Sequence, residues 1–136
     1  MINSDFIWPV RVYYEDTDAG GVVYHANYLK FFERARTEML RAFGCEQDTL
    51  RTTLGILFVV RAMDIDFIRS ARFNELLETR TQIIELKKAS LTFSQHLTLG
   101  DAVLCQSNVR VACLDANTMR PKAIPENLLE LLKNEH

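Results

Sequence analysis

The residues of this sequence that are best suited to chemistry lie in one aspartate- and glycine-rich segment near its start. The segment runs from Asp16 to Gly21 (DTDAGG) and continues to Tyr24 and His25. A carboxylate serves as a general base or a nucleophile, and imidazole and phenol groups exchange protons. Two adjacent glycines let a ligand approach the main chain closely. The residue types therefore predict acid–base or nucleophilic chemistry at this segment.

A helix is predicted directly after this segment. Its apolar residues recur with helical periodicity and Gly44 provides a natural stop, which together predict a helix over about residues 25–43. The apolar stripe consists of Tyr28, Phe32, Ala35, Met39 and Phe43, widened by Leu29 and Leu40. The first amides of a helix have no intrahelical partner and favour negative charge. The carboxylate of Asp18 is thus predicted to stand beside an anion-binding helix start.

The segment does not match the sequence motifs of common binding and catalytic sites, but it is compatible with an ordinary turn. A calcium loop of the EF-hand type is excluded because Gly20 occupies its fifth position and Asn27 its twelfth. A phosphate-binding loop would need Gly-Lys-Ser/Thr, and the Gly-x-Ser-x-Gly motif of serine hydrolases is absent from the sequence. Taken alone, Asp16 and Asp18 also suit turn formation and helix capping.

Composition indicates a globular protein of one domain, spanning residues 1–136. The chain has 136 residues, of which 48% are hydrophobic and 25% charged, both ordinary values. Its net charge of −2 provides no general attraction for nucleic acid or for an anionic membrane. Neither is therefore predicted as a partner, although local basic clusters remain available for a phosphorylated ligand.

Cysteine and histidine spacing argues against disulfides and metal. The three cysteines are odd in number and widely spaced, so reduced and buried thiols are predicted: Cys45, Cys105 and Cys113. The three histidines, His25, His96 and His136, are too scattered for a zinc pattern. We therefore predict no metal and no other cofactor.

The location is predicted to be cytoplasmic. Residues Met1 to Trp8 contain Asp5 and lack the basic and apolar regions of a signal peptide. The longest apolar stretch, Ile56 to Val60, is too short to span a bilayer.

The elements that must position the reactive segment are mainly strands. A first strand is predicted over Phe6–Tyr14, and a short C-terminal helix over Glu126–Lys133. Four long strand candidates with hairpin-like breaks lie between, at Leu57–Ile68, Leu76–Leu86, Leu91–Leu99 and Val103–Leu114. Side chains alternate in the third, where Leu91, Phe93, Leu97 and Leu99 share one face, and in the fourth, where Val103, Cys105, Val109, Val111 and Cys113 do.

One long helix must then lie on one face of an antiparallel sheet that curls around it, and long edge strands favour pairing with another copy.

The stretch from Tyr14 to Tyr28, with Asp18, His25 and the run VVYHANY, resembles the signature of the 4-hydroxybenzoyl-CoA thioesterase family of hotdog-fold enzymes. Its particular form is similar to the YbgC-type acyl-CoA thioesterases, whose genes commonly lie beside those of the bacterial Tol–Pal envelope system. The resemblance extends to about Pro125. It implies an α+β hotdog fold, with one long helix wrapped by about five antiparallel strands. It also implies a dimer, or a tetramer built as a dimer of dimers, with active sites between subunits.

The resemblance assigns roles to individual residues. Asp18 matches the catalytic carboxylate, and the amide of His25 matches the group that polarises the thioester carbonyl, with Tyr24 beside it. The side chains of His25 and Tyr14 are also implicated in the site. No metal is implied. The acyl pocket is partly built by residues 56–60, which are aliphatic here apart from one phenylalanine and favour an alkyl chain.

Basic residues later in the chain match the part of the family's site that holds coenzyme A. Lys87, Lys88 and Ser90 align with a turn that binds the nucleotide phosphates, where the benzoyl-CoA enzyme has arginines. Lysine keeps the charge but loses bidentate geometry. Arg120 and Lys122 lie near a second basic stretch of the family.

The resemblance therefore implies hydrolysis of small or fatty acyl-CoA. Asp18 would act as a general base on water or as a direct nucleophile, and the residues do not choose between the two. Two other functions stay open: a hydratase or dehydratase on the same fold, and a module that binds acyl carrier protein or an envelope complex. A carrier protein would need basic surface, for which the candidates are Arg69, Arg72, Arg80, Lys87 and Lys88.

Overall fold

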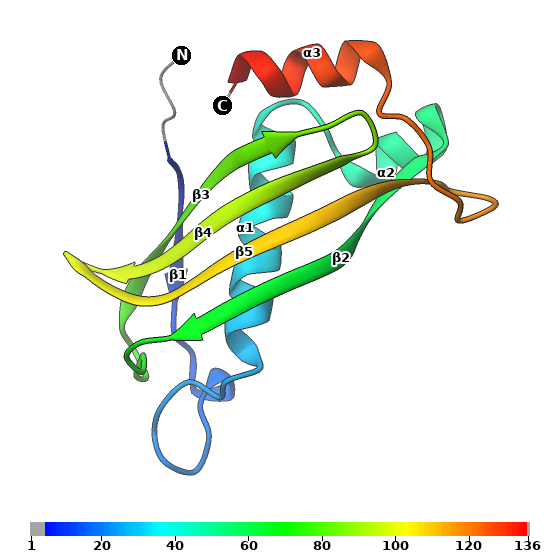
Figure 1. Cartoon of the computed structure of the whole chain (residues 1–136). Helices are drawn as coiled ribbons and strands as arrows, with labels where there is room; N and C mark the ends of the chain where they lie inside the picture. The colour runs from blue at the N-terminus through cyan, green and yellow to red at the C-terminus, as the bar shows by residue number, and fades with distance from the viewer. Residues whose placement is uncertain (1–4, 136) are drawn as a thin grey trace.

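The computed structural model describes residues 5–135, so that Met1–Ser4 and His136 of the predictions above lie outside it. Five strands form one antiparallel sheet in the order β1-β3-β4-β5-β2. Their bounds are Phe6–Arg11 (β1), Ile56–Phe67 (β2), Leu76–Leu86 (β3), Ser90–Leu99 (β4) and Ala102–Asp115 (β5). The long helix α1, Asn27–Ala42, lies across one face of this sheet (Figure 1).

Shorter helical segments complete the described chain. A 3-10 turn, η1, covers Tyr14–Asp16 before α1; α2, Gln47–Thr49, and η2, Leu50–Leu54, follow it. The helix α3, Glu126–Glu135, lies at the end of the sheet where β3 turns into β4 (Figure 1). Within residues 5–135, no helix is both long and apolar enough to cross a membrane.

The core lies between α1 and the sheet. Met39 of the helix packs in one core cluster with Phe93 and Val109. Phe31 and Phe32 pack in a second cluster with Leu97. Each such side chain contributes roughly 1.5–3 kcal/mol when it is fully buried. The amphipathic pattern of α1 thus fixes which face of the sheet it covers.

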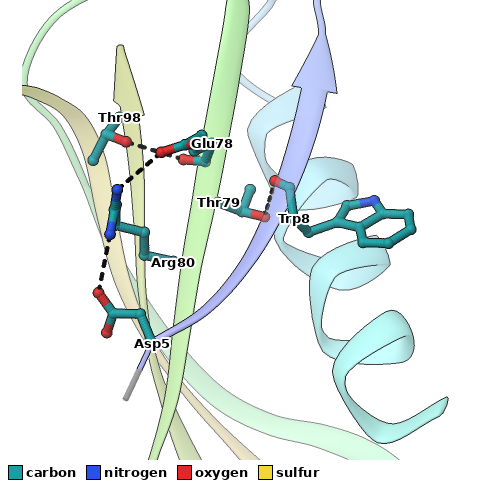
Figure 2. Close-up of polar contacts among 6 residues, drawn as sticks. All are labelled: Asp5, Trp8, Glu78, Thr79, Arg80 and Thr98. Atoms are coloured by element: carbon teal, nitrogen blue, oxygen red, sulfur yellow. Dashed lines mark hydrogen bonds and ion pairs between the residues drawn. The ribbon is translucent and has the colours of Figure 1, made fainter. Parts of the chain in front are cut away.

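The edge strand β1 is fastened to β3 by polar contacts (Figure 2). The hydroxyl of Thr79 donates to the carbonyl of Trp8 at 2.9 Å. Arg80 forms ion pairs with Glu78 at 2.9 Å and with Asp5 at 3.6 Å. β1 therefore has its partner on one side, and the opposite edge of the sheet is formed by β2.

Most predicted elements are confirmed to within two residues, with two corrections. The first strand ends at Arg11 rather than Tyr14, because Tyr14 belongs to η1. Leu29 of the predicted helical stripe is 40% exposed, and Phe31 is buried instead. The shared face predicted for β4 is confirmed: Leu91, Phe93 and Leu97 are buried, and Leu99 packs, partly buried, against the core.

The helices α2 and η2 had no prediction, because three- and five-residue segments carry too little periodicity to be recognised. The three cysteines are free and buried, as predicted.

Candidate active site

The loop before α1 is held in shape by Asp16. Its buried carboxylate accepts hydrogen bonds from the amide of Tyr13 at 2.8 Å and from the side-chain nitrogen of Asn27 at 3.1 Å. Its carbonyl accepts the amide of Tyr24 at 2.9 Å. Asp16 therefore connects η1 to the first turn of α1.

Asp18, two residues later, is exposed and lies in a tight turn. Its amide donates to the carbonyl of Val22 at 2.9 Å, and its carbonyl accepts the amide of Gly21 at 3.0 Å. The amide of Gly20 donates to Asp18 Oδ1 at 2.8 Å, which leaves further acceptor capacity on the carboxylate. Gly21 has φ of +80°, a conformation that favours glycine. The two glycines thus serve to position one carboxylate.

The helix start beside Asp18 retains unused amides. The amide of Tyr24 donates to the carbonyl of Asp16, so it is not available to a ligand. Within residues 5–135, the amides of His25 and Ala26 donate no hydrogen bond to another residue. The first turn of α1 also has no acidic side chain and no side-chain cap. These amides can therefore donate hydrogen bonds to a negatively charged atom of a ligand.

A pocket of about 270 Å³ joins these groups. It is lined by Asp18, Val22, Val23, His25, Tyr28, Phe67, Ile68, Arg69 and Ser70. The exposed imidazole of His25 lies between the rings of Tyr24, at 4.6 Å, and Phe67, at 6.4 Å. The structure therefore brings Asp18 and His25 to one cavity, and the unused amide of Ala26 follows His25 directly.

Tyr28 is a structural member of this pocket. Its hydroxyl accepts the amide of Ala71 at 2.9 Å, which joins α1 to the segment after β2. Burial raises the pKa of Tyr28 above its ordinary value, so this phenol stays protonated at neutral pH.

Tyr14 and Tyr24 are not among the residues that line the pocket. Tyr14 is 79% exposed, and its ring contacts Phe73 edge-on at 6.0 Å. Tyr24 is 46% exposed and contacts His25. Both rings lie at the surface in the isolated chain.

The predicted phosphate-binding residues lie in the turn between β3 and β4. The amide of Lys87 donates to the carbonyl of Ser90 at 2.8 Å, which closes the turn. The side chains of Lys87 and Lys88 are exposed, and the ammonium of Lys87 lies 3.7 Å from Glu85. Lys122, of the second basic stretch, pairs with Asp115 at 3.7 Å, and Arg120 is exposed.

These basic residues lie far from Asp18 within one chain. The Asp18 loop is bridged to Arg72, just before β3 begins, whereas Lys87 follows the end of β3. At about 3.3 Å per residue, the ten residue steps of β3 from Leu76 to Leu86 span about 33 Å. Figure 1 shows the loop before α1 and the β3–β4 turn at opposite ends of the sheet. One chain alone does not bring the two parts of the predicted site together.

Two arginines near Ser90 were missed in the sequence. Arg61 of β2 and Arg110 of β5 line a pocket of about 220 Å³ together with Ser90 and Pro121. Both arginines are exposed, and within residues 5–135 neither pairs with a carboxylate within 4.0 Å. The alternation of side chains along β5 predicts that Arg110 lies on the face opposite the core. That Arg61 and Ser90 lie beside it could not be predicted, because it depends on the order of the strands in the sheet.

Known proteins resemble this chain over nearly its whole length. A family model described as "Thioesterase-like superfamily" matches residues 12–132. The chain is 47% identical to an acyl-CoA thioesterase, YbgC, of Haemophilus influenzae, with 94% of each chain covered. It is 45% identical to an acyl-CoA thioester hydrolase, YbgC, of Escherichia coli, with 98% of this chain and 99% of that protein covered.

Solved structures agree with these relatives. A probable thioesterase from Bartonella henselae is 38% identical and superposes with a TM-score of 0.86, covering 90% of this chain and 100% of its own. The predicted hotdog fold, a five-stranded antiparallel sheet with one long helix on its inner face, is thereby confirmed. The chain belongs to the thioesterase-like superfamily.

Proposed function

We propose that this protein is an acyl-CoA thioesterase, which hydrolyses small or fatty acyl-CoA to the free acid and coenzyme A. The observation that carries the proposal is that Asp18 and His25, whose amide is unused at the start of α1, line one pocket. The two YbgC relatives, at 45–47% identity, are named for this reaction.

The reaction can be derived from this geometry. The thioester carbonyl oxygen accepts hydrogen bonds from the amides of His25 and Ala26, which stabilise the negative charge as the carbonyl carbon is attacked. Asp18 either removes a proton from the attacking water or attacks directly and forms an anhydride that water then hydrolyses. The carbon–sulfur bond breaks, and the coenzyme A thiolate takes up a proton. The proposed donor is the exposed imidazole of His25, which lines the same pocket. The assignments of Asp18 and His25 remain proposals.

The test is release of free thiol from a series of acyl-CoA substrates, run with wild-type protein and Asp18→Asn. The substitution removes the negative charge but preserves the size of the side chain. We expect loss of turnover with an unchanged circular dichroism spectrum and melting temperature, because Asp18 is exposed and bears one side-chain hydrogen bond. Near-normal kcat in a folded Asp18→Asn protein would refute the role. Hydration of an unsaturated acyl-CoA, or dehydration of a hydroxyacyl-CoA, without thiol release would identify a different enzyme class.

We further propose that the active unit is a homodimer joined along β2. This strand is a 12-residue edge with exposed apolar side chains at Val60, Met63 and Phe67. A two-fold axis that pairs two such edges antiparallel carries the partner's β3–β4 turn to the end of the sheet that holds Asp18. Lys87, Lys88 and Ser90 of the partner subunit would then complete the site with phosphate contacts. Tetramer assembly from two such dimers stays a prediction.

Acyl carrier protein is a second candidate for the thiol carrier. Arg69 lines the Asp18 pocket, and Arg72 is exposed beside it, so a surface able to meet an acidic carrier surrounds the pocket. Running acyl carrier protein thioesters beside acyl-CoA in the same assay compares the two.

The cytoplasm is the proposed location, because three free buried cysteines suit a reducing compartment. A link to the Tol–Pal system stays a prediction.

A further inference from the structure

Arg36 is a buried arginine on α1, and its hydrogen-bond partner in residues 5–135 is a neutral side chain. Arg36 is 9% exposed, and its Nη1 donates to Gln95 Oε1 at 3.0 Å. The amide nitrogen of Gln95 in turn donates to the carbonyl of Phe32 at 2.9 Å and the hydroxyl of Thr81 at 3.0 Å. The guanidinium is thus held in place between α1 and the inner face of the sheet.

The positive charge of Arg36 is not neutralised by a contact within the described chain. Among residues 5–135, no carboxylate lies within 4.0 Å of its guanidinium. Burial lowers the pKa of Arg36 from its ordinary value, and Glu33 opposes this only partly. A buried charge without a counter-charge is costly, and an apolar side chain of similar volume is often more stable at such a position.

Arg36 lines a pocket whose remaining wall is largely apolar. The pocket has a volume of about 230 Å³ and lies between α1, β2 and the centre of the sheet. Its apolar lining consists of Leu40, Phe58, Val60, Leu91, Phe93 and Val111. Such a cavity suits a hydrocarbon chain, and its one buried cation suits an anionic end.

An apolar row on β2 leads from this pocket to the Asp18 pocket. The register shift after Val60 keeps Val60, opposite Val111, on the same face as Met63, opposite Val109. Ile65 and Phe67 continue this row along the inner face of the edge strand, where Val60, Met63 and Phe67 stay exposed in the single chain, and Phe67 lines the Asp18 pocket. Along α1, Tyr28 of the Asp18 pocket and Arg36 are separated by eight residue steps, about 12 Å.

From this arrangement we infer that the acyl-binding channel is built for a chain with a carboxylate at its far end, which pairs with Arg36. The inference rests on the proposed thioesterase function and specifies its substrate class as α,ω-dicarboxylic acyl thioesters. The thioester lies at Asp18, the methylenes lie along the β2 row, and the distal carboxylate accepts hydrogen bonds from the guanidinium nitrogens that do not face Gln95.

Glu33 lies at the mouth of the same pocket and weakens this interaction. It is exposed, and its Oε2 accepts the hydroxyl of Thr37 at 2.6 Å. Its charge opposes an incoming carboxylate through solvent, whereas Arg36 attracts it inside the pocket, where screening is weaker. The buried group therefore dominates.

The experiment compares kcat/KM for dicarboxylyl-CoA thioesters, from glutaryl-CoA to hexadecanedioyl-CoA, with monocarboxylyl-CoA thioesters of equal chain length. We expect the ratio of kcat/KM for dicarboxylyl-CoA to kcat/KM for monocarboxylyl-CoA to peak at one chain length. That chain length reports the length of the path from Asp18 to Arg36 in the assembled enzyme. Arg36→Met, which keeps a long apolar side chain, should lower that peak ratio by about 10- to 100-fold, the range for a hydrogen bond to a charged group. Arg36→Lys should retain part of the preference.

Arg34→Met is the matched control, because Arg34 is an exposed arginine on the same helix; it should leave the ratio unchanged. Equal losses on both substrate classes in Arg36→Met, or a wild-type ratio that is flat with chain length, would overturn the inference and leave the thioesterase function standing. Absence of thiol release from every acyl-CoA would instead refute the function itself. If Arg36→Met fails to fold, Glu33→Gln provides the second variant, and it should raise the ratio at the same chain length.

Discussion

At the scale of single residues, Asp16 and Asp18 have the same chemistry and different environments. Asp16 is buried and its carboxylate accepts two hydrogen bonds that connect η1 to α1. Asp18 is exposed, lines the pocket, and receives one bond from Gly20. A carboxylate whose acceptors are used by the fold has little capacity left for a reacting water, whereas Asp18 retains it. The difference in environment gives Asp16 a role in loop shape and is consistent with the proposed chemical role of Asp18.

Cys105 predicts how stability responds to alkaline pH. Burial, reinforced by the charge of Asp66, raises the pKa of this thiol from 9.0 to about 12. Below about pH 9 both folded and unfolded states hold the proton, so the contribution to stability is complete. As the pH rises from about 9 to about 12, the unfolded state ionises first and the free energy of unfolding falls, by on the order of 4 kcal/mol at the upper end.

Urea unfolding across this pH range measures the effect. Cys105→Ala should be less stable at neutral pH because it leaves a cavity, but should lose less stability between pH about 9 and about 12. Tyr28, Cys45 and Cys113 also have raised pKa values and contribute to both proteins, so the difference between the two curves isolates Cys105. Parallel curves would contradict the prediction.

At the scale of elements, the start of α1 is the feature on which the proposed chemistry depends. Ala26 is its N-cap, with φ of −69°, a value that proline adopts without strain. Ala26→Pro removes one unused amide and retains the carbonyl, which accepts the amide of Leu29. We expect kcat to fall by about 100- to 1,000-fold, as for the loss of one oxyanion-binding donor.

Ala26→Gly serves as the control for this substitution, since it changes the side chain but keeps the amide. It should retain most of the activity. Circular dichroism and the melting temperature report whether α1 is preserved in Ala26→Pro. Unchanged kcat in a correctly folded Ala26→Pro protein would mean that this amide does not bind the thioester oxygen.

The elements themselves were largely predictable because their patterns are long. Sixteen residues of α1 and eleven of β3 give several repeats of their own periods. Arg36 was not expected in the core, since periodicity identifies a helix face by its apolar residues and this one is charged. The register shifts in β2, β3 and β5 were not predicted either, because they depend on the pairing of two strands.

At the scale of the whole molecule, sequence order says little about which site residues meet. Asp18 and His25 are close in sequence, and the structure brings them to one pocket. Arg61, Arg110 and Ser90 are distant in sequence and converge only because β2, β5 and β4 are neighbours. The turn at Lys87 and Lys88 lies at the other end of the sheet from Asp18. The family signature predicts residue roles, whereas the proposed homodimer would explain how these residues act together.

The separation of Asp18 from Lys87 and Lys88 leads to a complementation prediction. One inactive variant is Asp18→Asn, and the other combines Lys87→Ala with Lys88→Ala, which should raise KM for acyl-CoA far more than for a short acyl-pantetheine. If each site takes its carboxylate from one subunit and its lysines from the other, a mixed dimer contains one fully wild-type site and one doubly altered site. If each site is built from one chain, no mixed dimer contains a wild-type site.

The two variants are unfolded together in urea, refolded as an equimolar mixture, and assayed at acyl-CoA concentrations well below the KM of the lysine variant. Random pairing makes half of the dimers mixed, each with one of two sites intact, so about a quarter of wild-type activity should return. Variants that are refolded separately and then combined serve as the control for slow subunit exchange. Activity no higher than the mean of the separate variants would place the lysines outside the composite site, and a single monomeric species in sedimentation would remove the dimer itself.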